Sequence, residues 1–171
     1  AASIGSRVHE VLHEVYTRLL RDGAFDKDDL NDRIARARGI LRNAWGETAD
    51  EDEALRAARF PVLSSIEDRQ RLAALDAFLD ADLRRLHAAG LVPEALEQKA
   101  SGAIEGGPPG LVLRARFDRG LRGSTGQVVS DYKTGGDVSA RVKPAAMLAG
   151  GSLQVPIYAL LSGSPVELLV H

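Results

Sequence analysis

Two acidic residues and a lysine have types and spacing that suit metal-dependent chemistry. In SDYKTG, Asp131 and Lys133 are two residues apart, so a β-strand would place both on one face. Asp118 ends an earlier strand-like stretch, and pairing of the two strands would bring both carboxylates to one cation. Two carboxylates, a carbonyl and waters suit Mg²⁺ or Mn²⁺, and a neighbouring lysine can orient water or offset charge on a phosphate. The alternative is a surface ion pair between Asp131 and Lys133.

The charge around these residues is locally positive. Residues 111–143 hold seven Lys and Arg against three Asp, which is +4, whereas the whole chain has a net charge of −2. A basic stretch with a few acids inside it is what a site for a polyanion needs. Ordinary solvated strand faces are the alternative explanation.

Hydrophobic spacing predicts helices in the first half of the chain and strands in the second. The predicted helices cover residues 8–22, a stretch that begins near Asp28, a short stretch that Pro61 ends, and a long stretch from a Ser65–Asp68 capping pattern to Gly90. The predicted strands cover 94–104, 111–118, 127–135 and 166–171, with turns at 106–110 and 119–126 and a helix at 153–163.

This order of elements predicts an α/β fold with a mixed central sheet and an N-terminal helical elaboration. We expect a single domain over 1–171, with a helical part over about 1–90 and an α/β core over about 91–171. The chain has no starting methionine, which is consistent with excision from a longer protein. It has no cysteine, no secretory signal and no membrane-length apolar run, which fits a cytoplasmic protein and excludes cysteine-ligated iron–sulfur clusters.

A second chemical pattern, HEVLH at residues 9–13, matches the H-E-x-x-H helix of zinc peptidases. Such a site needs a third ligand. The metzincin extension would require Gly at 16 and His at 19, where the chain has Tyr16 and Leu19. His87 and His171 have no orienting context, so the zinc peptidase is the less favoured hypothesis.

Five stretches, in order, resemble the motifs of the PD-(D/E)XK nuclease superfamily, and specifically its RecB-type (RecB/AddB-like) nuclease domains. They are GSRVH (5–9), PEALEQK (93–99), RARFDRG (114–120), VVSDYKTG (128–135) and LQVPIYALL (153–161). One departure is Ala115, where the family has glycine three residues before the aspartate. The resemblance implies a restriction-endonuclease-like core with a mixed central sheet and flanking helices.

The resemblance also implies roles for individual residues. Asp118 and Asp131 would bind the metal together with the Tyr132 carbonyl and His9, which would leave Glu10 and His13 as incidental helix residues. The implied catalytic residues are Asp118, Asp131, Lys133 and the auxiliary acid Glu97, and the implied DNA contacts are Gln154, Tyr158, Arg119 and Thr134.

The function implied by the resemblance is metal-dependent hydrolysis of DNA phosphodiesters by a RecB-family nuclease, an exonuclease rather than an endonuclease, in DNA repair or recombination. The expected cofactor is Mg²⁺ or Mn²⁺ without an iron–sulfur cluster. The expected partners are DNA and a fused or associated helicase, without a membrane. Two alternatives stay open: a catalytically inactive DNA-binding or structural module on the same fold, and the zinc peptidase.

Overall fold

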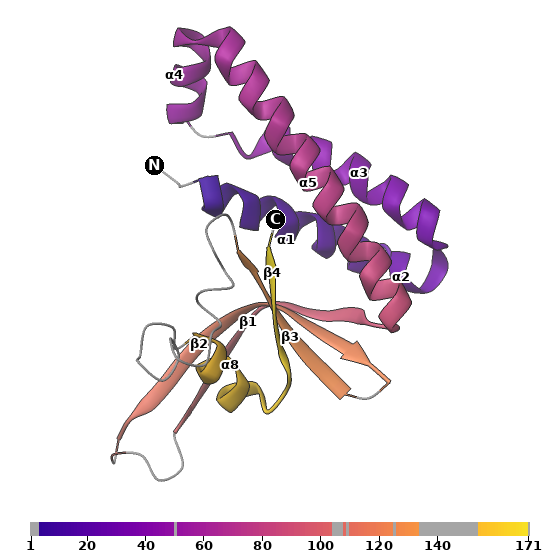
Figure 1. Ribbon diagram of the computed structural model, residues 1–171, viewed down its shortest axis with the longest axis vertical. Helices are drawn as coiled ribbons and strands as arrows, with labels where there is room; N and C mark the ends of the chain where they lie inside the picture. Colours follow the sequence, from indigo (N-terminus) through magenta and orange to yellow (C-terminus); the bar gives the residue numbers. More distant parts are fainter. Residues whose placement is uncertain are drawn as a thin grey trace. The chain divides into compact units, whose positions relative to one another are not determined.

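A computed structural model of the chain describes residues 4–49, 51–103, 108, 110–124, 126–133 and 154–170. The chain forms two compact units, one within Ala1–Gly90 and one within Leu91–Val170 (Figure 1). Each unit is described by itself, and the assignment of 1–171 to a single domain stays a prediction. Among the helices of the described stretches, none is both long enough and apolar enough to cross a bilayer.

The N-terminal unit is helical, as predicted. Its elements are α1 (Ile4–Arg21), α2 (Ala24–Lys27), α3 (Leu30–Glu47), α4 (Glu51–Arg59) and α5 (Pro61–Ala89). Helix α3 packs against both α1 and α5, and Figure 1 shows α3 running alongside α5. The apolar positions of α1 at helical spacing are buried, namely Val8, Leu12, Val15 and Leu19.

Local sequence determines where several of these helices begin and end. The Asp29 side chain accepts the Asp32 N–H at 2.9 Å and so caps the start of α3. Gly23 follows α1 and Gly90 follows α5, with φ of 69° and 61°, a left-handed conformation that glycine adopts without a Cβ clash. Helix α2 has four residues, too few to show a hydrophobic period, and was not predicted.

The predicted start of the long helix at Ser65 is wrong. Helix α5 begins at Pro61, whose missing N–H costs nothing at a first helical position. Ser65 therefore lies inside the helix, where its carbonyl accepts the Arg69 side chain at 3.2 Å. The Ser65–Asp68 pattern resembles a capping box by coincidence, while the prediction that Pro61 follows a short helix is confirmed by α4.

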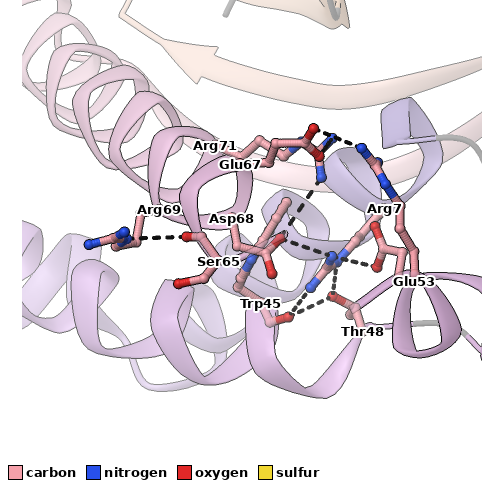
Figure 2. A network of polar contacts seen from close by, with 10 residues as sticks. Arg7, Trp45, Thr48, Glu53, Ser65, Glu67, Asp68, Arg69 and Arg71 are labelled. Atoms are coloured by element: carbon pink, nitrogen blue, oxygen red, sulfur yellow. Dashed lines mark hydrogen bonds and ion pairs between the residues drawn. The ribbon is translucent and has the colours of Figure 1, made fainter. Parts of the chain in front are cut away.

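A buried arginine joins three helices of this unit (Figure 2). The Arg7 side chain of α1 is 7% exposed, and its guanidinium lies 3.8 Å from the centroid of the Trp45 ring on α3. It donates hydrogen bonds to the Trp45 carbonyl, to Thr48 Oγ1 at 3.3 Å and to the Glu53 carboxylate on α4. These hydrogen bonds and the Trp45 ring replace the hydration that the Arg7 guanidinium loses on burial.

The C-terminal unit is a mixed sheet with one helix, which confirms the predicted α/β class. It contains β1 (Val92–Ala103), β2 (Val112–Gly123), β3 (Gly126–Lys133), α8 (Gln154–Ser162) and β4 (Val166–Val170), in the sheet order β1-β2-β3-β4. The first three strands pair antiparallel, whereas β3 and β4 are parallel. Helix α8 lies between β3 and β4 in sequence, as the crossover of a parallel pair requires.

Strand β2 is longer than predicted, and the eight-residue turn at 119–126 is wrong. The strand continues through the buried Leu121 to Gly123, and pairing with β3 ends only at Gly123 and Gly126. Gly126 has φ 133°, which a residue with a Cβ rarely adopts. The predicted turn at 106–110 and the predicted strand end at 134–135 lie mostly or wholly outside the described residues.

An apolar cluster holds α8 on the sheet. Phe117, Val129 and Tyr158 form its buried centre, with Ile157 and Leu161 of α8 packed around them. The Phe117 and Tyr158 rings meet edge to face, with centroids 4.7 Å apart. The position of α8, and of the polar groups at its start, therefore follows from this packing.

Replacing Arg7 by alanine should lower the free energy of unfolding of the N-terminal unit by about 3 kcal/mol, because a buried, hydrogen-bonded cation is removed from among its partners. Urea unfolding followed by far-ultraviolet circular dichroism measures this. Arg36→Ala is the matched control, since Arg36 forms an ion pair with Asp28 at the surface and should change stability little. Equal effects of the two substitutions would contradict the role given to Arg7.

Candidate functional site

The two predicted metal-binding acids lie where strands β2 and β3 stop pairing. The last pair of the β2–β3 ladder is Arg119 with Ser130. Asp118 and Asp131 are the next residues on the two strands, so continuing the same register places them across from each other. Here the N–H of Tyr132 donates to the Asp118 carboxylate at 2.6 Å, so a side chain takes part where the ladder ends. We call this position the fork.

Helix α8 orients the Asp131 carboxylate, which is 3% exposed. Gln154 Nε2 lies 3.1 Å from Asp131 Oδ1 and 2.7 Å from the Tyr158 hydroxyl oxygen, so its two N–H groups serve both acceptors. The Tyr158 hydroxyl lies 2.7 Å from the Arg116 carbonyl and 3.3 Å from Asp131 Oδ1. Because a hydroxyl has one proton, the shorter contact to Arg116 takes it, and Gln154 is the principal donor to Asp131.

The Tyr158 hydroxyl stays protonated at this position. Burial raises its pKa most, and the negative charges of Asp131 and Asp118 raise it further, against a hydrogen bond from Gln154 that lowers it. The resulting pKa is about 12. Tyr158 therefore acts as a neutral hydrogen-bond donor and not as a base, and both carboxylates act on this one hydroxyl.

The donor set at the fork fits a hard divalent cation. An ionised carboxylate offers about four acceptor positions, so Asp131 can bind a cation in addition to its hydrogen bonds. Two carboxylates supplemented by carbonyls and water are the ligands that Mg²⁺ and Mn²⁺ prefer. Over the described stretches, no three His, Cys, Asp or Glu side chains gather closely enough to hold a metal ion. Within this unit, a cation at Asp118 and Asp131 would thus depend on carbonyls and water for its other ligands.

The side chains of the HEVLH stretch in α1 are not arranged as the ligands of a peptidase zinc ion. His13 Nε2 lies 3.5 Å from the Thr17 hydroxyl one turn along α1, and Glu10 is exposed. A peptidase zinc needs three protein ligands, and the described part of the chain offers no third ligand beside these histidines. His13 therefore has a local contact within α1.

Glu97 lies beside Asp118 on the neighbouring strand. The β1–β2 pairs on either side of Glu97 keep one register, which places it across from Asp118. Its φ of 54° is unusual for a residue with a side chain. The Glu97 carboxylate forms an ion pair with Arg116. The hydrogen bond from Arg116 to Glu97 raises the arginine pKa most, followed by the charges of Glu97 and then Asp118.

Arg119 and Tyr132 are placed in the sheet interior. Arg119 is fully buried, and its guanidinium carbon lies 5.2 Å from the centroid of the Tyr132 ring. This placement differs from the expected DNA contact, because a buried guanidinium does not offer its donors to a phosphate. Tyr132 follows Asp131 directly, so its backbone lies at the fork as a carbonyl ligand requires.

Three predicted site residues are not tested by this geometry. Lys133 is the last described residue of β3, and its side chain lies outside the described part of the structure. Thr134 also lies outside the described residues. His9 belongs to α1 of the N-terminal unit. The roles of these three residues stay predictions.

The sequence interpretation missed Arg116. Its carbonyl accepts the Tyr158 hydroxyl and its side chain binds Glu97, so it holds two neighbours of the carboxylates. Strand alternation was sufficient to place Arg116 on the same face as Asp118, two residues along. The contact with Glu97 depends on the register of β1, which the sequence did not indicate.

Ionisation of Tyr158 should be visible in stability at high pH. Because its pKa is raised from 10 to about 12, the stabilising effect of the protonated form is complete below pH 10 and is lost as pH rises towards 12. The loss should reach about 1 kcal/mol, because solvent screening around the hydroxyl reduces the 1.36 kcal/mol per pKa unit that full desolvation would give. Urea unfolding between pH 9 and 12 measures it, and Tyr158→Phe should lack this part of the decline. Parallel curves for the two proteins would contradict the pKa shift (~2 units).

Comparison with known proteins agrees with this geometry. The model of the PD-(D/E)XK nuclease superfamily matches residues 1–166. A search of curated proteins finds no match to the chain. The helices and the mixed four-stranded sheet are consistent with a restriction-endonuclease-like fold. Because the match extends over nearly all of the sequence, the chain belongs to the PD-(D/E)XK nuclease superfamily.

Proposed function

We propose that the chain is an active, metal-dependent nuclease domain of RecB type that hydrolyses DNA phosphodiesters. Membership of a superfamily of nucleases supports hydrolysis of nucleic acid as the reaction. The five motif stretches in RecB-type order support the finer assignment. By that resemblance we extend the proposal to an exonuclease of DNA repair and recombination in the cytoplasm, working with a fused or associated helicase.

The observation that carries the proposal is the arrangement of the two acids at the fork. Asp118 and Asp131 come from different strands, and each lies one residue beyond Arg119 and Ser130, the last β2–β3 pair. Like charges at this position oppose pairing of the strands, and a bound cation would relieve the repulsion. The hydrogen bond from Tyr132 would account for Asp118 in an inactive module, whereas a second acid at Asp131 is what a cation site needs.

Asp118 and Asp131 would hold Mg²⁺ or Mn²⁺, with the Tyr132 carbonyl as a further ligand, and the family resemblance adds His9 to the proposed ligands. When bound, the cation would supply Lewis-acid polarisation of a phosphate oxygen and a lower pKa for water. The protein would supply the fixed orientation of the ligands. Gln154 contributes most to that orientation through its bond to Asp131.

The other residues of the site have distinct tasks in this proposal. Alternation along β3 predicts the Lys133 side chain on the same face as Asp131, where its ammonium group would orient the attacking water and offset charge that develops on the phosphate. Tyr158 is a positioning residue, since its hydroxyl is neutral and bonded within the protein. Glu97 would act as the auxiliary acid once its carboxylate is released by Arg116.

Removing either carboxylate should abolish cleavage. Asp118→Asn and Asp131→Asn keep the size and an acceptor oxygen but lose the charge that binds the cation, so the rate should fall at least a hundredfold or so. Hydrolysis of plasmid and single-stranded DNA in Mg²⁺, with and without chelator, measures this. Asp80→Asn is the control, because Asp80 pairs with Arg84 on α5 and should keep the wild-type rate. A wild-type protein that binds DNA without cutting it would favour the inactive module.

Lys133 should affect the rate of cleavage without affecting the metal. Lys133→Gln should lower kcat about a hundredfold, the effect of removing one donor to developing charge, while the affinity for Mn²⁺ stays at the wild-type value. Calorimetric titration with Mn²⁺ and single-turnover cleavage measure the two quantities. Asp131→Asn provides the contrast, since it should weaken both. Full activity of Lys133→Gln would remove the lysine from the mechanism.

A further inference from the structure

An exposed basic surface lies on paired strands β1 and β2, in the part of the two strands that is far from the β2–β3 turn. Lys99 lies directly across from Arg116, and Ser101 directly across from Arg114. Residues that oppose each other in an antiparallel pair point to the same face of the sheet. All four are exposed. We call Lys99, Ser101, Arg114 and Arg116 the basic ribbon.

This arrangement has a cost in the folded protein. Two cations directly across from each other, as in Lys99 and Arg116, destabilise a strand pair. Glu97 neutralises Arg116. Within the described part of the chain, neither Lys99 nor Arg114 has an ion-pair partner. Lys99 and Arg114, which are diagonal neighbours in the strand pair, thus keep their charges without a partner, as a binding surface for a polyanion would require.

The basic ribbon has the form of an open groove. Lys99, Ser101, Arg114 and Arg116 line a cavity of about 530 Å³, together with the two alanines between them. Among the residues that the structure describes, no aromatic side chain lines this cavity. Without a ring for a base to stack on, the groove suits contacts to phosphates and sugars, which carry no sequence information.

The basic ribbon leads to the fork. Arg114, Arg116 and Asp118 follow one another at two-residue steps on β2, and each step spans roughly 7 Å. The charge of Asp118 contributes to the raised pKa of Arg116, so these two groups are within electrostatic reach. A polyanionic strand bound along the ribbon would thus come within electrostatic reach of Asp118.

We propose that the basic ribbon binds the sugar–phosphate backbone of a DNA strand and brings that strand to Asp118, at the β2 side of the fork. The inference rests on the proposed nuclease function and names the surface by which the substrate is held. The contacts to the sugar–phosphate backbone do not depend on the base sequence of the DNA. A phosphate at Arg116 competes with the Glu97 carboxylate for the same guanidinium, so binding of the strand releases Glu97 beside Asp118.

The test is the salt dependence of binding to a labelled single-stranded oligonucleotide, measured by fluorescence anisotropy on the full chain in chelator, where cleavage does not occur. The double variant Lys99→Gln/Arg114→Gln should raise Kd at least tenfold or so at low salt. It should also reduce the slope of log K against log salt by about 1.4, which is two contacts at about 0.7 each for a single strand. Glu97→Gln should tighten binding, because it removes the competitor for Arg116.

Arg122→Gln is the matched control. Arg122 is an exposed arginine on the same strand, close to the β2–β3 turn, where it lies 3.5 Å from Glu94. It should leave both Kd and slope at the wild-type values. An unchanged slope in the double variant, or an equal loss in Arg122→Gln, would overturn the inference. Oligonucleotides of different sequence should give the same result, and a strong preference would also overturn it.

The two proposals fail in different ways. If the wild-type protein cuts DNA in Mg²⁺ while the double variant binds as tightly as wild type, the basic ribbon is wrong and the nuclease stands. If the wild-type protein does not cut DNA while the double variant loses binding, the nuclease is wrong and the ribbon stands as a DNA-binding surface. Circular dichroism of each variant checks that the fold is intact.

Discussion

The candidate site depends on the point at which β2 and β3 stop pairing. At this point the Asp118 carboxylate accepts the N–H of Tyr132, so that a side chain takes part in holding the two strands together. Had the ladder simply continued, Asp118 and Asp131 would be one more cross-strand pair of like charge, with a cost and no use. In the proposed function the same two charges would serve as ligands where the ladder ends, and the free energy of binding a cation would add to the stability of the fold.

The site and the core of the C-terminal unit share one residue, Tyr158. Its ring meets Phe117 edge to face within the apolar cluster, and its hydroxyl accepts from Gln154 beside Asp131. Burial keeps this hydroxyl neutral, and a neutral hydroxyl can donate to the Arg116 carbonyl in a stretch of β2 that β3 does not pair with. Packing of α8, satisfaction of the backbone and orientation of the carboxylate therefore depend on one another.

The sequence was informative where a short stretch determines the geometry. The two-residue spacing of a strand was enough to place Asp131 and Lys133 on one face, whereas Gln154 and Tyr158 were selected by the resemblance of their stretch to a family motif. The sequence was not sufficient where contacts between distant segments determine the structure. The length of β2 follows from pairing with β3, and the burial of Arg119 follows from the tertiary structure. Pro61 was taken only as the end of one helix, although proline also suits the start of the next.

The charges of the C-terminal unit are separated along β2, and this separation has a consequence for the order of binding. Lys99 and Arg114 attract a polyanion, whereas Asp118 and Asp131 repel it. A phosphate can therefore reach the fork at low cost only when a cation has neutralised the two acids, and a phosphate placed there favours the cation in turn. In the proposed nuclease, affinity for the strand and affinity for the metal would thus be coupled through electrostatics alone, and the coupling would act equally in both directions.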